Sequence, residues 1–426
     1  MSHRQFEESE DNCEVLEEEN RSIIMGLISQ LRKGSDLSRI TLPTFVLEPR
    51  SLLEKLSDFM SHPELLVKAS KTTDPVQRFV EVCRFFLSGW HVKPKGVKKP
   101  YNPVLGEFFR CEYKLKDGVK AMYIAEQVSH HPPVSAYYYT LPELGIFVKG
   151  EAHPKAKFLG NSAATIMQGY SRITFSELQN ETYEITNPNV YARGILFGKM
   201  VMEIGDQSVV RCASSGLVCE LDFKSKGFFS GQYHSVSGKI KRESTQEVLY
   251  EISGIWTEEL FIKKKVRESN LLLLNLTPYY HQSSKESFFN VKDHTVIHKL
   301  VEPLENQEWN ESRKLWSKVT AGLVTKDLDT ATDEKTFIED RQRAETAARL
   351  KEGLQWHSRF FTLNQNEEYE FNGAKGIDYR NLHQTGKHLE EYIFTHNTTP
   401  SHTSTETMVG EYNQSNVGDG RKTITA

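Results

Sequence analysis

The stretch EQVSHHPP spans Glu126–Pro133 and follows Gly118–Ala125, a run of residues that favours β-structure. Because its two closing prolines cannot continue a sheet ladder, the sequence predicts that His130 and His131 lie at the end of a strand. Adjacent strand residues point to opposite faces of a sheet, so these histidines are poorly placed to chelate one metal ion. At the rim of a sheet, both imidazoles can reach an anionic ligand. The alternative is a pair of hydrogen-bonded histidines in a surface turn.

This octapeptide resembles the signature of the oxysterol-binding-protein-related family of lipid-transfer proteins. The resemblance runs from about Ile40 to Phe361 and includes LPTFVLEPR (Leu42–Arg50), which resembles the branch of the family that carries phosphatidylserine rather than sterol. The other matching stretches are KKPYNPVLGE (Lys98–Glu107), KFLGNS (Lys157–Ser162), RGILFGKM (Arg193–Met200), EKTFIEDRQR (Glu334–Arg343) and WHSRFF (Trp356–Phe361).

The spacing of apolar residues changes along the chain. An N-terminal third with helical spacing, in which Asp74 and Pro75 predict a helix start, gives way at about Gly106 to period-two patterns separated by turn residues. Helical spacing returns in Thr332–Leu350, which Gly353 ends. We therefore predict a β-dominated α+β fold in which a large antiparallel β-barrel encloses a lipid tunnel, with an N-terminal lid helix, an N-terminal helical layer and C-terminal helices.

Composition suggests where this domain begins and ends. Eight acidic and no basic residues fall between positions 7 and 19, which is typical of a solvated tail. The apolar residues that follow form either a core helix or, as the resemblance implies, the lid over the tunnel: Ile23, Ile24, Leu27, Ile28 and Leu31. The predicted parts are an acidic disordered tail at 1–20, the lid at 21–41, a lipid-binding domain at 42–362 with its barrel at about 100–260 and C-terminal helices at about 311–353, and a disordered tail at 363–426.

The totals restrict the class of protein. Of 426 residues, 38% are hydrophobic and 11% aromatic, which is enough for a core. A mean hydropathy of -0.52 and the lack of an apolar run of about 18 residues predict that no transmembrane helix is present. The acidic start is unlike a signal peptide, and five scattered cysteines fit the reduced thiols of the cytosol, so we expect a cytoplasmic protein. A net charge of -4 argues against nucleic acid as a partner and limits membrane contact to transient, local contact.

Two segments carry residues suited to a phosphorylated headgroup. Lys99 and Asn102 belong to a basic loop that is either simply solvated or, as the resemblance implies, meets the headgroup, with Lys99 as a point charge and Asn102, held extended by the following proline, as a donor. Lys335, Glu339 and Arg343 recur every four residues and share one helix face, either as surface salt bridges or, as the resemblance implies, as a face that meets the same headgroup as the histidines. The implied phosphoinositide-binding set, in which the fork of Arg343 grips phosphate, is Lys99, Asn102, His130, His131, Lys335, Glu339 and Arg343.

The resemblance also implies a set of residues that bind phosphatidylserine. Leu42 is expected to line the tunnel mouth and Thr44 to bond the serine headgroup, with Asn161 and Ser162 as further polar partners. Each has a plainer alternative as a core, strand or turn residue. The implied set is Leu42, Thr44, Lys99, Asn102, Asn161 and Ser162.

The chain lacks GxSxG, P-loop and HExxH motifs and any metal-ligand spacing of cysteine and histidine, so we expect no enzyme activity, metal site or cofactor. The expected function is that of a cytosolic lipid-transfer protein. It would extract phosphatidylserine and exchange it for phosphatidylinositol 4-phosphate, at contacts between the endoplasmic reticulum and the plasma membrane. The alternatives are a sterol/phosphatidylinositol 4-phosphate exchanger and a lipid-regulated scaffold or sensor without net transport.

Overall fold

The structure, a computed structural model, describes residues 32–37, 43–93, 96–116, 118–195, 200–226, 231–265 and 284–395. The five predicted lid residues and Leu42 lie outside these ranges, as do the acidic segment between residues 7 and 19 and the chain after residue 395. None of the described helices combines the length and the apolar composition needed to cross a bilayer.

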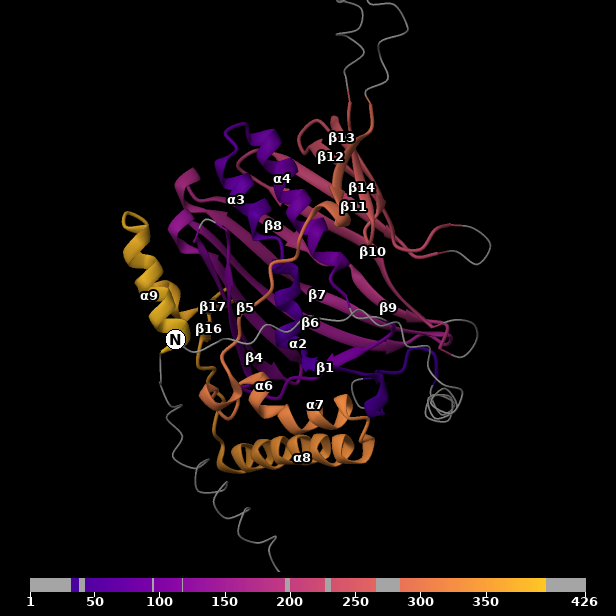
Figure 1. The fold of residues 1–426 in the computed structure, drawn as a ribbon, viewed down its shortest axis with the longest axis vertical. Coiled ribbons are helices and arrows are strands. Elements are labelled where there is room, and N and C mark those ends of the chain that lie inside the picture. The colour runs from indigo at the N-terminus through magenta and orange to yellow at the C-terminus, as the bar shows by residue number, and fades with distance from the viewer. Residues whose placement is uncertain are drawn as a thin grey trace, which may run out of the picture.

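A 13-stranded antiparallel sheet forms the body of the described structure (Figure 1). Strands pair in chain order, except that β8 pairs with β10 as well as β7, and β9 pairs with both β7 and β10. Leu217, Cys219, Leu221 and Phe223 of β11 face the core, as their period-two spacing predicts. The strands are β3 (Phe108–Lys114), β4 (Lys120–His130), β5 (Pro133–Leu141), β6 (Ile146–Phe158), β7 (Ser162–Phe175), β8 (Glu181–Thr186), β9 (Asn189–Arg193), β10 (Val201–Cys212), β11 (Leu217–Lys224), β12 (Ser235–Arg242), β13 (Val248–Ile255), β14 (Glu259–Lys264) and β15 (Glu286–Asn290).

The predicted β-dominated α+β fold with a large antiparallel sheet is confirmed. Its strands extend to Asn290, beyond the predicted limit of about residue 260. The outer edge of β3 is covered by the segment that leads into the C-terminal helices, because Glu112 exchanges backbone hydrogen bonds of 2.9 and 2.7 Å with Leu300, and Phe108 bridges to Glu311. This cover satisfies backbone groups that an exposed edge would present to another chain.

The N-terminal helices pack on one face of the sheet. The longest, α4, begins where the sequence predicts, because the Asp74 carboxylate accepts the Gln77 N–H at 2.7 Å and Pro75 occupies the first turn. Phe79, Cys83 and other buried residues of α4 join the same hydrophobic cluster as the inward row of β11. These elements are α2 (Leu52–Leu56), the 3-10 turn η3 (Ser57–Met60), α3 (Pro63–Lys71), α4 (Pro75–Ser88) and η4 (Gly89–His91).

The C-terminal helices lie at the lower end of the molecule in Figure 1, beneath a two-stranded parallel sheet of β1 (Leu47–Ser51) and β2 (Lys99–Tyr101). Tyr101 stacks on Trp316 with ring centroids 4.8 Å apart, within a hydrophobic cluster that joins β1 and β2 to these helices. The helices are α6 (Ser312–Leu315), α7 (Ser317–Val324) and α8 (Leu328–Glu352). Gly353 ends α8 at a φ of 67°, which confirms the predicted stop.

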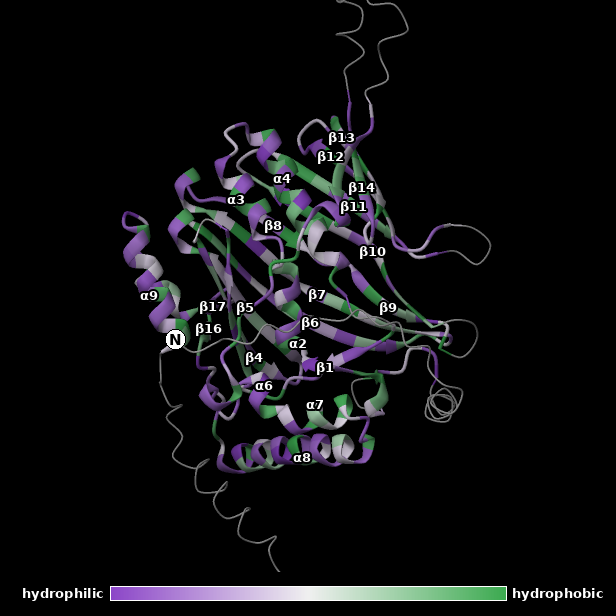
Figure 2. Ribbon diagram, viewed as in Figure 1, coloured by the Kyte–Doolittle hydropathy of each residue, from purple (hydrophilic) through white to green (hydrophobic). Residues whose placement is uncertain are grey.

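The structure corrects the prediction of a disordered tail from residue 363, because residues 363–395 are folded. They complete β16 (Phe361–Leu363) and form β17 (Tyr369–Phe371), η10 (Asn372–Gly376) and α9 (Leu382–Phe394). Phe371, Leu389 and Ile393 pack against the other face of β4 and β5. Figure 2 shows why the composition misled, since α9 is largely hydrophilic and carries only a few apolar residues.

This C-terminal layer should contribute to the stability of the whole fold. Leu389 is 0% exposed, so Leu389→Ala is expected to lower the free energy of unfolding by about 2–5 kcal/mol. Leu363 is 51% exposed, and Leu363→Ala should change it by no more than about 0.5 kcal/mol. Urea unfolding followed by far-UV circular dichroism measures both. If Leu389→Ala changed the free energy of unfolding as little as Leu363→Ala, the C-terminal layer would unfold independently of the sheet.

Candidate functional site

The two histidines contact each other at the end of β4. His130 Nδ1 lies 3.2 Å from His131 Nε2, and the ring centroids are 4.5 Å apart. The rule that adjacent residues face opposite ways does not separate them, because His131 already lies in the turn to β5. The Asn102 side-chain amide nitrogen lies 3.2 Å from His130 Nε2. The structure thus brings three of the predicted phosphoinositide-binding residues together.

These contacts determine which ring nitrogen donates and which accepts in the histidine pair. With the Asn102 amide donating to His130 Nε2, the neutral His130 ring carries its hydrogen on Nδ1 and donates it to His131. Burial of the ring, followed by the charge of His131, lowers the pKa of His130 to about 4. His130 is therefore neutral at pH 7, and its one ring N–H is donated to His131.

Three further predicted residues gather where α8 approaches β2. Lys335 Nζ lies 2.7 Å from Glu339 Oε1, and the Lys335 side chain is only 11% exposed. The pKa of Lys99 is lowered, first by desolvation of its ammonium and then by the charge of Lys335, although Glu339 acts in the opposite sense. By surface area Lys99 is exposed, so the desolvation reflects the protein atoms crowded around it more than a loss of contact with solvent. An anion placed here would relieve the repulsion between the two ammonium groups.

Arg343 points elsewhere. Its guanidinium pairs with Asp340 and lies 3.5 Å from Glu339 Oε2, and its side chain is 61% exposed. Its fork is therefore engaged with carboxylates of its own helix. The predicted grip on phosphate would require the guanidinium to leave both of them.

Thr44, predicted to bind the serine headgroup, is buried in the 3-10 turn η2 (Thr44–Val46). Its hydroxyl lies 3.1 Å from that of Thr332 on α8. Thr332 belongs to the same helix face as Lys335 and Glu339, one turn earlier. Sequence reasoning missed Thr332, although its spacing of three and seven residues before Lys335 and Glu339 is a signal that could have found it.

Asn161 lies in the turn between β6 and β7, and Ser162 begins β7. The Asn161 carbonyl accepts the backbone N–H groups of Gly194 and Ile195, at 3.0 and 3.2 Å, and the Ser162 carbonyl accepts that of Leu159 at 2.8 Å. A small hydrophobic cluster of Val46, Phe158 and Ile195, with Phe45 packed against it, joins this turn to the segment that carries Thr44. The fold therefore brings the two parts of the predicted serine-lipid set to one hydrophobic cluster.

Glu107, another residue that sequence reasoning missed, fixes the loop between Asn102 and β3. Its buried carboxylate accepts the Ser312 hydroxyl at 2.7 Å, the Trp316 indole N–H at 2.9 Å and the Val104 N–H at 3.1 Å. Burial raises the pKa of Glu107, against the effect of these donors. The loop that presents Asn102 is thus fastened to α6 and α7 by one side chain.

Glu126 fixes the strand that carries the histidines in a similar way. Its carboxylate accepts the backbone N–H groups of Arg359 and Phe360, each at 2.8 Å. Burial raises the pKa of Glu126 to about 7, although these donors oppose the change. The first residue of EQVSHHPP therefore ties β4 to the segment WHSRFF, far along the chain.

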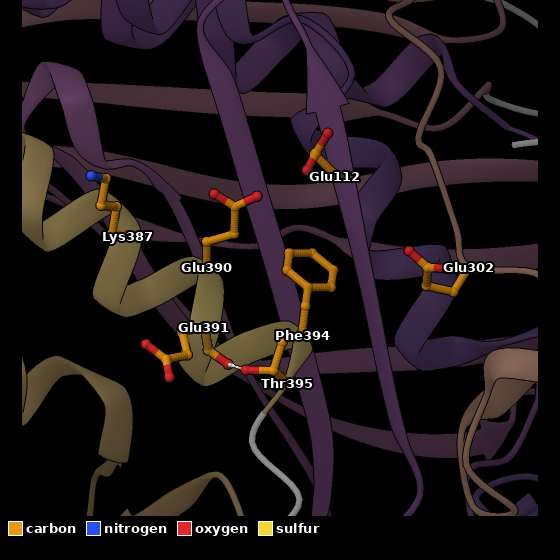
Figure 3. Close-up of a pocket in the computed structure, with 7 residues that line it drawn as sticks. All are labelled: Glu112, Glu302, Lys387, Glu390, Glu391, Phe394 and Thr395. Carbon is orange, nitrogen blue, oxygen red and sulfur yellow. Dashed lines mark hydrogen bonds between the residues drawn. The ribbon is translucent and has the colours of Figure 1, made fainter. Parts of the chain in front are cut away.

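One open recess of about 340 Å³ lies away from these residues, between α9 and β3 (Figure 3). Its walls carry four carboxylates, which would repel a phosphate group, and none of the predicted site residues lines it. The lining residues are Glu112, Glu302, Lys387, Glu390, Glu391, Phe394 and Thr395. Among the described residues, no group of three or more His, Cys, Asp and Glu side chains is placed to hold a metal ion.

Comparison with known proteins now adds to this geometry. The family model of the oxysterol-binding protein matches residues 26–381. The chain belongs to this family. It is 46% identical over 379 residues to an oxysterol-binding protein homologue of Schizosaccharomyces pombe, a match that covers 86% of this chain and 75% of that protein. It is 44% identical over 346 residues to oxysterol-binding protein homolog 7 of Saccharomyces cerevisiae, covering 80% of this chain and 76% of the relative.

Solved structures of low sequence identity share the fold. The Osh1 ORD domain in complex with ergosterol superposes with a TM-score of 0.70 at 23% identity, over 91% of this chain and 92% of that one. The Osh3 ORD of Saccharomyces cerevisiae in complex with PI(4)P gives a TM-score of 0.62 at 22% identity, over 91% of this chain and 97% of that one. Membership of the oxysterol-binding protein family, predicted from EQVSHHPP, is confirmed.

The contacts of Glu107 predict how its carboxyl group can be replaced. In Glu107→Gln, the amide oxygen can accept from Trp316 and Val104 while the amide nitrogen donates to the Ser312 hydroxyl, whose own hydrogen can go to the Phe108 carbonyl 3.1 Å away. We therefore expect the free energy of unfolding to change by less than about 1 kcal/mol. Glu107→Leu leaves two buried N–H donors unpaired, at about 1–3 kcal/mol each.

Urea unfolding at pH 7 compares the two variants, with Ser312→Ala as a control that removes one donor only. A loss for Glu107→Gln as large as that for Glu107→Leu would contradict this interpretation, because it would show that the charge is required.

Proposed function

We propose that this member of the oxysterol-binding protein family is a lipid-transfer protein that exchanges phosphatidylserine for phosphatidylinositol 4-phosphate between membranes. The observation that carries the proposal is that Lys99 lies beside Lys335 and Glu339, while Asn102, three residues further along the chain, contacts the histidine pair. The complex of the related Osh3 domain with PI(4)P supports a phosphoinositide ligand.

A phosphomonoester suits these groups electrostatically. It carries about -1.5 to -2 charges near neutral pH and offers three acceptor oxygens. Lys99 and Lys335 supply positive charge, while Asn102 and His131 supply directional donors. The acyl chains contribute little to the choice between lipids. Burial of a methylene in the tunnel stabilises it by about 0.8 kcal/mol, which is about the same as its burial in the bilayer. Selectivity must come from the headgroup, where an unpaired buried polar group costs about 1–3 kcal/mol.

A serine headgroup suits the neighbouring residues. Its carboxylate and phosphate fit the cationic Lys99, and its ammonium fits the Thr44 hydroxyl oxygen. Since Lys99 would serve both lipids, they would exclude each other. Consumption of phosphatidylinositol 4-phosphate at one membrane would then drive phosphatidylserine transport against its own gradient. We place this exchange at contacts between the endoplasmic reticulum and the plasma membrane, with transient contact to either surface.

A second candidate is exchange of sterol for phosphatidylinositol 4-phosphate. It is favoured by the related Osh1 domain, which was solved in complex with ergosterol and with cholesterol. A lipid-regulated sensor, which binds without net transport, is the alternative of a different class.

Lipid extraction and transfer between liposomes tests all three functions. We expect the protein to extract labelled phosphatidylserine, phosphatidylinositol 4-phosphate to compete with it, and an opposing phosphoinositide gradient to accelerate serine-lipid transfer. Extraction of sterol without phosphatidylserine would identify a sterol exchanger. Saturable binding with no transfer above the protein-free rate would identify a sensor. Mass spectrometry of lipid that copurifies with the protein provides an independent measure.

The geometry of α8 favours Lys335 over Arg343 as the stronger phosphate contact, although a guanidinium offers fork geometry. Lys335 is packed beside Lys99, whereas Arg343 is turned toward Asp340. We expect Lys335→Ala to weaken phosphatidylinositol 4-phosphate binding about tenfold, equivalent to about 1.4 kcal/mol, and Arg343→Ala to weaken it no more than about twofold.

Titration with phosphoinositide liposomes measures both affinities. Lys318→Ala is the matched control for the loss of one surface charge. Lys318 is an exposed lysine of the neighbouring helix α7 that pairs with Glu334 of α8. A larger loss in Arg343→Ala would show that its guanidinium turns from Asp340 to the ligand.

A further inference from the structure

The hydroxyl groups of Thr44 and Thr332 form a hydrogen-bonded chain with a fixed direction. Thr332 Oγ1 donates to the Leu328 carbonyl at 2.7 Å, the usual bond of a helical threonine to the residue four positions earlier. A hydroxyl has one hydrogen, so the 3.1 Å contact between the two threonines must be donated by Thr44. The hydrogen of Thr44 is therefore committed to Thr332, and its oxygen is left as an acceptor only.

Packing holds the two threonines in register. The Thr44–Val46 turn leads directly into β1, whose first residue, Leu47, belongs to the same hydrophobic cluster as Ala331. Ala331 is fully buried and precedes Thr332, and α8 contacts the η2 turn, which places the two hydroxyl groups opposite each other. Thr44 itself is buried, which limits the water that could otherwise reorient its hydroxyl.

An acceptor that cannot donate discriminates between headgroups. It forms its strongest hydrogen bond with a charged N–H donor such as an ammonium, and it has no hydrogen to offer a headgroup that presents only acceptors. A hydroxyl free to rotate can serve as either donor or acceptor, so it loses this preference.

We propose that Thr332 is a positioning residue for lipid selection: it fixes the Thr44 hydroxyl as an acceptor and thereby favours headgroups that carry an ammonium. The inference rests on the proposed binding of phosphatidylserine. It adds a residue on the helix of Lys335 and Glu339 that acts on the serine lipid rather than on the phosphoinositide.

The experiment uses Thr332→Val in the full chain, which keeps the shape of the side chain and removes the hydroxyl. Thr336→Val is the matched control, because Thr336 makes the same bond to a helix carbonyl, at 2.8 Å to Thr332, one turn further from Thr44. Competition between phosphatidylserine and phosphatidylglycerol, which carries neutral hydroxyl groups in place of the ammonium and carboxylate, is measured by extraction from liposomes, alongside extraction of phosphatidylinositol 4-phosphate.

We expect Thr332→Val to reduce the preference for phosphatidylserine over phosphatidylglycerol about three- to tenfold, with phosphoinositide extraction within about twofold of the unmodified protein. Thr332→Ser should restore the preference, and Thr336→Val should leave it unchanged. In a Thr44→Val background, Thr332→Val should have no further effect, since the group that it orients is gone.

The outcomes separate this inference from the proposed function. If the unmodified protein extracts no phosphatidylserine, the proposed function fails. If it does, and Thr332→Val keeps the preference or loses both lipids in parallel, Thr332 has only a structural role and the inference fails.

Discussion

Burial of β4 on both faces is the constraint on which the rest of the structure depends. Ala121, Tyr123 and Ala125 belong to the cluster shared with the N-terminal helices, whereas Met122 and Ile124 belong to the cluster shared with the C-terminal layer. A strand buried on both faces reads as a nearly continuous apolar run, as this one does. Such a run does not by itself fix the register, because either row of side chains could face either layer.

Glu126 fixes the register of β4. Its side chain lies in the same row as Met122 and Ile124, where its carboxylate accepts the backbone N–H groups of Arg359 and Phe360. A slip of one residue would turn this carboxylate toward the hydrophobic inner cluster, where it would lack these donors at a cost of several kcal/mol. Because His130 follows four residues later, the register that Glu126 selects also decides where the histidine pair lies.

The features of the fold that the sequence predicts correctly are those that depend on residues close together in the chain. The start of α4 at Asp74, the stop of α8 at Gly353 and the end of β4 at the histidines each depend on neighbouring residues. The folding of 363–395 does not, because α9 has few apolar residues and finds their partners about 250 positions earlier in β4 and β5. Thr332 and Glu107 likewise make contacts across 288 and more than 200 positions. No spacing rule connects Thr332 with Thr44, or Glu107 with Ser312.

The electrostatics of the candidate site explain why competition between lipids would need no change of shape. Desolvation and the neighbouring charge of Lys335 already lower the pKa of Lys99, so each further unit of positive charge nearby is unfavourable and each negative one is favourable. Glu339 offsets only part of this imbalance, since one carboxylate serves two ammonium groups. A headgroup phosphate would more than offset the remaining positive charge, and a second anion would have no cation left to neutralise it. Under the proposed function, exclusion of one lipid by the other therefore follows from a shared charge, even before the volume of their acyl chains is considered.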